Sequence, residues 1–433
     1  MKTIPARIRE RRLSQAIREH GFVYQSGVAD IQSHQLRKFN RLWVDIQRNV
    51  PYFRELVQGS TLPSTITDWD DFARLPCLTR PSFQVDATKF IDPSQNIVGW
   101  STTGGSTGTP FRSPYTPLES QFIMTNAWLG REFYGIQISD RMFSLWGHSH
   151  LFGRGWRRHV KQTQRMIKNW LLGHRVFSAY HLTPQRLRQA GSAILKMRPD
   201  FIMGYSRSLL LLARENADLA PAFGRLRLKA VIATTEAFSH PEDAAFIASV
   251  FGCPVGMEYG AAETGVIAYT HPADNRYRAF WDTYLLEAVP VNQTDAKLLL
   301  TALYPRALPL IRYDIGDIVH NCDLDGNSIV GFDRVLGRDN DLLDIGDGAH
   351  VHPVAVIHCI QSTPGVLGVQ VVQEKDKSIS IKIMCSAPLS NYAESAIRQN
   401  LSTLDPQLRN CKIAYAEQLD QTLAGKTKWV VKR

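Results

Sequence analysis

The chain has 433 residues, of which 44% are hydrophobic and 21% are charged, and its formal net charge is +10. This composition is ordinary for a globular protein, and the length is enough for about two or three folding units. No apolar run approaches the roughly 18 residues of a membrane span, and residues 1–25 lack the apolar core of a secretion signal, so we expect a cytoplasmic protein. The six cysteines form no C-x-x-C pair, which favours free, buried thiols over disulfides or a zinc site.

The positive charge is concentrated in two segments. Residues 1–50 contain ten Lys or Arg and four acidic residues, and residues 154–175 contain seven Lys or Arg and no acidic residue. This distribution argues against a nucleic-acid-binding protein, which needs a broader basic footprint, and suits an anionic ligand or a membrane surface. The second segment also contains Trp156 and Trp170. A packed helix with a solvated basic face, peripheral attachment to the inner face of the membrane, and attraction to ligand phosphates therefore all stay open.

In chain order, the apolar pattern first predicts helices and then an alternation of strands and helices. Leu36, Phe39, Trp43 and Ile46 recur with helical spacing, which predicts a helix over 31–50 that Pro51 ends. A further helix is predicted over 116–134. Strands are predicted at 142–146, 201–203 and 228–233, and helices at 184–197, 208–216 and 241–251. This alternation is typical of a layered α/β domain.

From about residue 297 the pattern changes to strands, and a second unit is expected to begin near Arg338. Strands are predicted at 298–303, 311–313 and 329–335, a hairpin at 366–372 and 378–384, and an amphipathic helix at 392–404. We therefore expect an α/β fold. Its large N-terminal layered α/β domain, residues 1–338, includes a β-rich subdomain, and its small C-terminal domain, residues 339–433, is α+β.

A stretch rich in Gly, Ser and Thr, GWSTTGGSTGTPFRSPYT at 99–116, lies between an apolar run and the predicted helix over 116–134. Such a loop between a strand and a helix offers backbone N–H groups and hydroxyls without bulk, which suits phosphate oxygens. The P-loop pattern G-x-x-x-x-G-K-[ST] is not matched, because Thr109 and Pro110 follow Gly108. On these residues alone, a phosphate-binding loop and a surface loop both stay open.

Four further stretches follow this loop: EYGAAETG at 258–265, PLIRYDIGD at 309–317, GRDNDLLDIGDGAHVHP at 337–353 and AGKTKWVVKR at 424–433. Each is weak alone. In this order and spacing, the chain resembles the adenylate-forming superfamily, in the branch of phenylacetate–CoA ligases and CapK-type capsule proteins. Two N-terminal stretches, QLRKFNRLWVDIQRNVPYFRELV and DFARLPCLTRPSF, resemble the same branch, so the resemblance spans almost the whole chain.

The resemblance implies a ligase that activates a carboxylic acid with ATP and Mg²⁺. The acid attacks the α-phosphorus of ATP to give an acyl-AMP and pyrophosphate, and a thiol or an amine then displaces AMP. The implied partners are a small carboxylic acid and, as acceptor, coenzyme A, a carrier protein or an amine, in surface-polysaccharide or specialised biosynthesis; homodimers occur in the branch. The alternative is a nucleotide-binding homologue with impaired catalysis that acts as a membrane-associated or regulatory protein.

The resemblance also implies which residues bind the nucleotide. The β- and γ-phosphates would be held by Thr103, Gly105, Ser106, Thr107 and Gly108. The residues beside the adenine and ribose would be Tyr259, Gly260, Asp317 and Glu236. Asp317 would accept hydrogen bonds from the ribose hydroxyls, which requires an ionised carboxylate. A turn-capping role for Asp317 and a helix-entry role for Glu236 stay open.

The resemblance assigns the catalytic roles to Glu263, Arg338 and Lys426. Glu263 would bind Mg²⁺, because a hard cation prefers carboxylate oxygen. Arg338 would approach the ribose and phosphates, and Lys426 would bring its charge to the carboxylate and the α-phosphate. The small domain would rotate about a hinge at 337–341 that contains Asn340, so that Lys426 leaves when the acceptor enters. A surface carboxylate at 263 and a solvated tail at 426 are the alternatives.

Three positions depart from the pattern of the superfamily. Ala262 stands where Ser or Thr is common, Asn340 where an acidic residue is common, and Arg112 one place beyond a usual lysine. The first two put the rate and the second half-reaction in doubt more than ATP binding, and Arg112 could take the place of the lysine.

Overall fold

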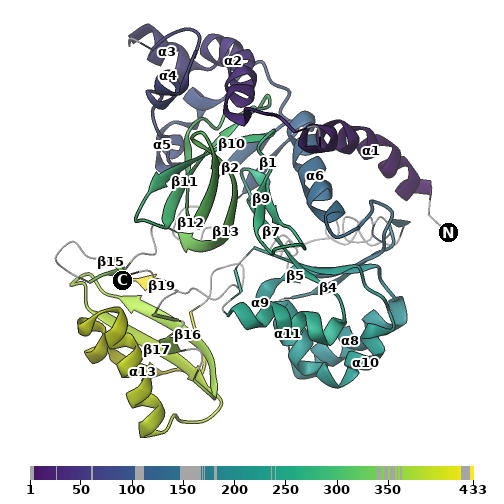
Figure 1. The fold of residues 1–433 in the computed structure, drawn as a ribbon, viewed down its shortest axis with the longest axis vertical. Helices are drawn as coiled ribbons and strands as arrows, with labels where there is room; N and C mark the ends of the chain where they lie inside the picture. The colour runs from purple at the N-terminus through teal and green to yellow at the C-terminus, as the bar shows by residue number, and fades with distance from the viewer. Residues whose placement is uncertain are drawn as a thin grey trace, which may run out of the picture.

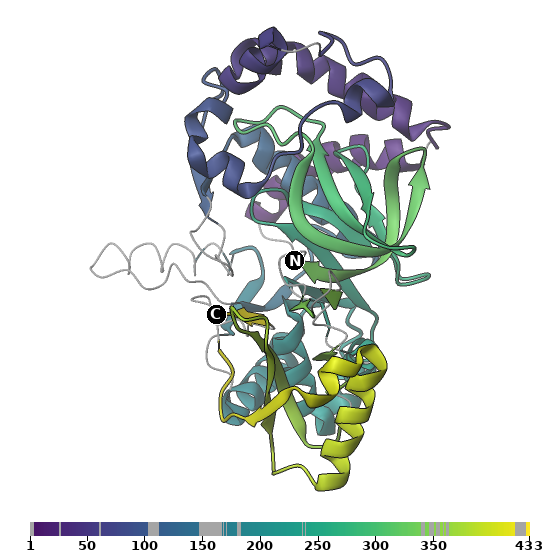
Figure 2. The same ribbon diagram turned by 90° about the vertical axis from the view of Figure 1, so that its left-hand side faces the viewer.

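The chain folds into N-terminal helices, a long mixed sheet flanked by helices, and a C-terminal α+β unit (Figure 1). In both views the C-terminal unit lies at the opposite end of the molecule from α2 (Ile31–Asn49) and α3 (Pro51–Gly59) (Figures 1 and 2). The computed structural model describes residues 4–25, 27–59, 62–102, 112–146, 167, 169, 171–179, 183–235, 237–238, 240–338, 343–345, 350–351, 356–357, 359–360, 363–420 and 430–433.

The predicted helix over 31–50 is confirmed as α2. Asp30 caps it by accepting a hydrogen bond from the backbone N–H of Ser33, and Phe39 and Trp43 on its apolar face are fully buried. α2 ends before Pro51, and the next helix begins there, where a proline is tolerated. The other helices of this region are α1 (Ile4–Gln25), α4 (Trp69–Ala73), α5 (Arg80–Val85) and the short η1 (Ala87–Phe90).

The Gly/Ser/Thr loop belongs to a hairpin, which corrects the expected strand–loop–helix arrangement. β1 (Gly99–Thr102) pairs antiparallel with β2 (Arg112–Tyr115), and Thr102 lies opposite Arg112 at the base of the loop. Only then does α6 (Pro117–Glu132) begin, capped by the Thr116 hydroxyl. The expectation that the loop leads directly into the helix was wrong, because the strand β2 lies between the loop and α6 and pairs with β1.

The central sheet has eleven strands within the described residues, in the order β10-β11-β12-β13-β9-β8-β7-β6-β5-β3-β4. The pairings among β4, β3, β5, β6 and β7 are parallel, and those from β7 to β10 are antiparallel. β10 also pairs with β13 at one position, which closes the antiparallel end into a small barrel. The strands are β3 (Met142–Trp146), β4 (His174–Ser178), β5 (Phe201–Tyr205), β6 (Ala230–Thr234), β7 (Val255–Ala261), β8 (Gly265–Thr270), β9 (Tyr277–Ala279), β10 (Tyr284–Pro290), β11 (Asp295–Ala302), β12 (Tyr313–Asp325) and β13 (Ser328–Arg338).

Helices cover both faces of the parallel part of the sheet. Along β5, Ile202 packs against the helices that connect the parallel strands, whereas Phe201 and Met203 pack into the core shared with α6. The alternating α/β pattern predicted from the sequence is therefore confirmed. The connecting elements are α8 (Pro184–Met197), α9 (Ser206–Glu215), η3 (Ala217–Leu219), α10 (Ala220–Gly224) and α11 (Pro241–Phe251).

The strand predicted at 311–313 is displaced in the structure. Arg312 has a φ of +45°, a left-handed conformation that a strand does not accommodate, so β12 begins at Tyr313. The Arg312 guanidinium accounts for this bend, because it contacts the buried carboxylate of Glu287 and the carbonyls of Ala73 and Leu75. A tertiary contact thus overrides the local strand pattern.

The C-terminal unit has a four-stranded sheet in its described part, in the order β18-β17-β16-β19. The predicted hairpin is confirmed as β16 (Val366–Gln373) and β17 (Ile379–Cys385), and the predicted helix as α13 (Asn391–Leu404). The expected fold class is therefore confirmed, whereas the exact boundary at 338/339 stays a prediction. The remaining elements are β14 (Leu343–Asp344), β15 (His350–Val351), η5 (Pro406–Asn410), β18 (Lys412–Tyr415) and β19 (Val430–Lys432).

All six cysteines lie in described positions and are free thiols, as expected. Their burial was predicted too broadly, since only Cys253 and Cys411 are buried and Cys77 is exposed. Within the described ranges, every helix is too short or too polar to span a bilayer.

Candidate functional site

Glu263 lies in the tight turn between β7 and β8, and its side chain is buried. The turn is possible because Ala261 pairs with Gly265, which has a φ of +74°. A Cβ on Gly260 would lie 2.0 Å from the carbonyl oxygen of Gly265, so the strand that leads to the turn also requires a glycine. The sequence YGAAETG therefore brings a carboxylate to the end of β7 in a close-packed backbone.

The two carboxylate oxygens of Glu263 have different surroundings. Oε1 accepts hydrogen bonds from Arg80 Nη2 at 3.0 Å and from the Tyr313 hydroxyl at 2.9 Å. Oε2 is buried and accepts no hydrogen bond from the described residues. A buried carboxylate oxygen without a donor is rare in folded proteins, and it is the kind of ligand that Mg²⁺ prefers. The residues present therefore fit the predicted divalent cation.

The charges in this cluster shift the pKa values of Arg80 and Tyr313. Burial is the largest single influence and lowers the pKa of Arg80, but the interactions with Glu263 and Tyr313 together outweigh burial, so the pKa of Arg80 is raised above its usual value. Burial raises the pKa of Tyr313, and the charge of Glu263 raises it further. Tyr313 therefore stays protonated and donates to the carboxylate.

A second arginine supports the backbone of the turn. Arg306 Nη2 donates to the carbonyl oxygen of Glu263 at 2.7 Å, and the same nitrogen lies 3.2 Å from Oε2 of the fully buried Glu119. Glu119 Oε1 in turn accepts from the backbone N–H of Ala307 at 2.8 Å. This buried network fixes the turn to α6 and to the segment before β12.

Tyr259 and Asp317, predicted to lie beside the adenine and ribose, are in contact. The Tyr259 hydroxyl donates to Asp317 Oδ2 at 2.8 Å, and the Tyr259 ring packs edge-on against Tyr277 and Phe332. Asp317 follows Gly316, which has a φ of +79°, and its backbone pairs with that of Arg338 across β12 and β13. Asp317 thus contacts Tyr259 through its side chain and pairs with Arg338 through its backbone, and the sequence spreads these three residues over 80 positions.

The stem of the Gly/Ser/Thr loop lies beside the turn of Glu263. The Ser101 hydroxyl donates to the carbonyl oxygen of Ala262 at 3.1 Å, which connects β1 to this turn. The guanidinium of Arg112 lies over the Trp100 ring, 5.4 Å from its centroid. Because strand side chains alternate, Trp100 and Arg112 occupy the hairpin face opposite to Ser101. This cation–π contact is what the structure assigns to Arg112, and it leaves the suggested lysine-like role a prediction.

Several predicted residues lie outside the described part of the chain. They are Thr103, Gly105, Ser106, Thr107, Gly108, Glu236, Asn340 and Lys426. For Arg338 only the backbone is described, and most of the basic segment 154–175 is likewise outside. The roles assigned to all these residues stay predictions.

Arg80, Tyr313 and Arg306 were not predicted to belong to the site. Arg80 and Tyr313 stand inside the stretches DFARLPCLTRPSF and RYDIGD that carry the family resemblance, so their membership of those motifs was the available signal. Contact between residues 183 positions apart has no local signature in sequence.

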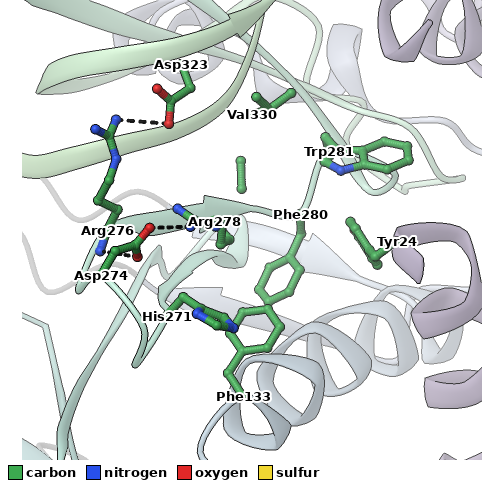
Figure 3. Close-up of a pocket in the computed structure, with 11 residues that line it drawn as sticks. Tyr24, Phe133, His271, Asp274, Arg276, Arg278, Phe280, Trp281, Asp323 and Val330 are labelled. Atoms are coloured by element: carbon green, nitrogen blue, oxygen red, sulfur yellow. Dashed lines mark hydrogen bonds and ion pairs between the residues drawn. The ribbon is translucent and has the colours of Figure 1, made fainter. Parts of the chain in front are cut away.

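A cavity of about 600 Å³ lies elsewhere, between α1, α6 and the outer face of β9 (Figure 3). One wall is aromatic, with Phe133, Phe280 and Trp281, and Arg276 and Asp323 form an ion pair at the other side. None of the predicted nucleotide residues with described side chains lines it. The alternation of β9 puts Arg276 and Arg278 on the face opposite to Tyr277, which contacts Tyr259. The cavity is therefore separate from the cluster around Glu263 and Asp317.

Comparisons with known proteins find similar sequences and similar folds. The family model described as the CapK C-terminal domain matches residues 345–433. Protein CapK of Staphylococcus aureus is 23% identical over 328 residues, covering 72% of this chain and 69% of the relative.

Solved structures resemble the chain over most of its length. A 2-hydroxyisobutyryl-CoA ligase in the postadenylation state has a TM-score of 0.68 at 15% identity, covering 92% of this chain and 89% of that chain. The O-succinylbenzoate coenzyme A synthetase of Bacillus subtilis, in complex with AMP, has a TM-score of 0.54 at 15% identity and covers 77% and 68%. An amide bond synthetase from Marinactinospora thermotolerans has a TM-score of 0.54 at 16% identity and covers 77% and 67%.

The fold is therefore that of the adenylate-forming ligases, as the motifs predicted. The C-terminal residues 345–433 match the CapK C-terminal domain, and a longer part of the chain is similar to Protein CapK, in agreement with the resemblance that the motifs indicated.

Proposed function

We propose that this protein is an ATP-dependent ligase that converts a carboxylic acid into its acyl-AMP and transfers the acyl group to a thiol or an amine. The observation that carries the proposal is the convergence of Glu263, the Tyr259–Asp317 pair and the stem of the Gly/Ser/Thr loop. These groups are spread over more than 200 residues, and each has the chemistry that one part of ATP requires.

In the first half-reaction, a carboxylate oxygen of the acid forms a bond to the α-phosphorus. The bond from this phosphorus to the bridging oxygen breaks, and pyrophosphate leaves. Negative charge accumulates on the phosphate oxygens, so positioned donors and cations lower the barrier. The loop at 103–108 would supply backbone donors, and Lys426 would supply positive charge. Glu263 Oε2 would hold Mg²⁺, which neutralises phosphate charge when bound.

The ribose and adenine would lie at the Tyr259–Asp317 pair. A carboxylate accepts hydrogen bonds from two adjacent hydroxyls, and the phenol of Tyr259 fixes the orientation of Asp317 through its 2.8 Å hydrogen bond. The buried, edge-on packing of Tyr259 against Tyr277 and Phe332 keeps this ring in place.

For the second half-reaction we propose two classes of acceptor, a thiol and an amine. The similar structures include CoA ligases and an amide bond synthetase, so a thiol of coenzyme A or a carrier protein and an amine are both supported as acceptors. The CapK-type branch favours a role in surface-polysaccharide or specialised biosynthesis.

The test is acid-dependent exchange of labelled pyrophosphate into ATP, over a panel of aryl, aliphatic, hydroxy and amino acids. We expect one class of acid to support exchange, and Glu263→Gln to lower the rate by about 100-fold or more. Adding coenzyme A or an amine panel then identifies the acceptor. If ATP binds and no acid in the panel supports exchange, the catalytically impaired, nucleotide-binding homologue is favoured instead.

A further inference from the structure

Arg80 is a positively charged side chain of the candidate site that has no role in the proposed reaction. It comes from the N-terminal helical region, yet its Nη2 lies 3.0 Å from Glu263 Oε1. Its side chain is 20% exposed, whereas that of Glu263 is 1% exposed. The guanidinium therefore separates the buried carboxylate from solvent on one side.

The backbone before Arg80 and the helix that begins at Arg80 together fix its position. Leu78 pairs in parallel with Tyr313: its N–H donates to the carbonyl of Arg312 at 3.1 Å, and its carbonyl accepts from the N–H of Asp314 at 2.8 Å. α5 then begins at Arg80, with a capping box between Thr79 and Ser82. Two backbone hydrogen bonds and a helix cap therefore fix the backbone of Arg80. Its side chain is held beside Glu263 by the fold.

Arg80 and Tyr313 donate to the same oxygen of Glu263. Both hydrogen bonds end on Oε1, and Oε2 accepts none from the described residues. A carboxylate whose two oxygens are equally available can bind a cation through both, a mode common for Ca²⁺. Mg²⁺ demands near-octahedral geometry and takes one oxygen of a carboxylate together with water and phosphate oxygens.

We propose that Arg80 is a positioning residue that restricts Glu263 to one-oxygen coordination and thereby selects Mg²⁺ over Ca²⁺ for the nucleotide. The proposal rests on the proposed function, in which Glu263 binds the divalent cation. Arg80 fills the second acceptor position of Oε1 beside the Tyr313 hydroxyl, so Oε2 alone is left for the metal. Partners of a metal ligand commonly change metal affinity by about 10–100-fold when they are removed.

Arg80 could act on the metal by positioning the Glu263 carboxylate or only through its positive charge. The ratio of the Mg²⁺ and Ca²⁺ affinities distinguishes these two effects, whereas either affinity alone does not. Removing the charge of Arg80 strengthens the attraction of Glu263 for every divalent cation alike. Removing Arg80 leaves Tyr313 as the one described donor to Oε1, so Oε1 regains a lone pair for a cation, which favours the larger Ca²⁺ because it accepts both oxygens. A loss of charge alone therefore leaves the ratio of the two affinities unchanged, whereas a loss of positioning shifts it.

The experiment measures the Kd of α,β-methylene-ATP by calorimetry at saturating Mg²⁺ and at saturating Ca²⁺, in the wild type and in variants. In Arg80→Ala we expect the ratio of the two affinities to move toward Ca²⁺ by about tenfold. Arg80→Met, which keeps the volume of the side chain, should show the same shift if the alanine variant does not fold. Arg80→Lys, which still donates to Oε1, should stay within about threefold of the wild-type ratio.

Two further variants separate the possible failures. Arg276→Ala removes an arginine whose ion pairs are with Asp323 and Asp333 rather than with Glu263, and it should leave the ratio unchanged. Glu263→Gln should weaken binding with both metals; if it does not, the metal role of Glu263 in the proposed function is wrong. If Glu263→Gln weakens binding and Arg80→Ala and Arg80→Met keep the wild-type ratio, the positioning role of Arg80 alone is overturned.

Discussion

The carboxylate of Asp282 joins the N-terminal helices to the sheet, and replacing it with asparagine tests how firmly they are attached. Its side chain is only 5% exposed. Oδ1 lies 2.8 Å from His34 Nε2 and 2.8 Å from Lys38 Nζ, and Oδ2 lies 3.4 Å from His20 Nδ1. Asp282→Asn keeps the shape of the side chain and removes its charge.

The structure sets the expected magnitude. Removing one partner of a fully buried ion pair costs about 3–5 kcal/mol, because the other charge is left uncompensated. Lys38 and His34 are partly exposed, and water screens part of the loss, so we expect a decrease of about 2–3 kcal/mol in the free energy of unfolding. The assay is urea unfolding followed by circular dichroism, with m-values compared to detect separate detachment of the helices. Asp45→Asn, on the exposed face of α2, is the control and should stay within about 0.5 kcal/mol of the wild type.

The pH dependence of this difference has a definite sign. Burial raises the pKa of Asp282, but hydrogen bonds from His20, Lys38 and His34 and the charge of Lys38 outweigh burial, so its pKa lies well below the usual 3.8. A depressed pKa stabilises the folded state above the unfolded-state pKa, and this stability is lost as the pH falls through the folded-state pKa. The gap between wild type and Asp282→Asn should therefore persist from about pH 7 to pH 4 and narrow only below that. Equal stabilities at pH 7, or a gap already closed at pH 5, would refute the reasoning.

Three other substitutions test the candidate site. Tyr259→Phe removes the hydrogen bond to Asp317 and should weaken ATP binding about five- to tenfold, as measured by calorimetry. Unchanged affinity would contradict the proposed role of Asp317 in binding the ribose. Gly260→Ala places a methyl group 2.0 Å from the carbonyl oxygen of Gly265 and should lower stability by about 2–3 kcal/mol, visible as a lower Tm, whereas a wild-type Tm would contradict the close approach. Lys426→Ala should abolish acid-dependent pyrophosphate exchange, and exchange at the wild-type rate would exclude its assigned role.

The helices that the sequence predicted most closely have well-defined ends in the structure. α8 and α11 have the predicted bounds, because each has a proline in its first turn and a residue in the left-handed conformation at its end. In α11 that residue is Gly252, which the pattern makes visible; in α8 it is Arg198, which only the backbone reveals. Boundaries set by tertiary contacts, such as the start of β12 at Tyr313, had no comparable local signal.

The residues of the candidate site also fall into those that the sequence predicted and those that only the structure shows. Glu263, Tyr259 and Asp317 were identified because they stand in ordered motifs, and the structure adds the contacts between them. Arg80 stood in a stretch that resembles the family, but composition and periodicity give a lone arginine after a loop no function. Arg80 meets Glu263 because the parallel bridge between Leu78 and Tyr313 brings this part of the chain to β12, and such a tertiary contact has no local pattern in the sequence.

That bridge has a consequence for how the protein can be divided. Leu78 lies against β12 at the residue where the barrel meets the turn of Glu263, so the N-terminal helical region supplies part of the wall around a buried carboxylate. A shortened chain that begins after residue 86 would keep every strand of the central sheet, yet it would remove the guanidinium that pairs with Glu263 and open Tyr313 to water. The smallest unit that keeps the surroundings of Glu263 intact therefore includes residues outside the motifs around it, and fusions or truncations of this chain should preserve the segment from Leu78 to Val85 with the sheet.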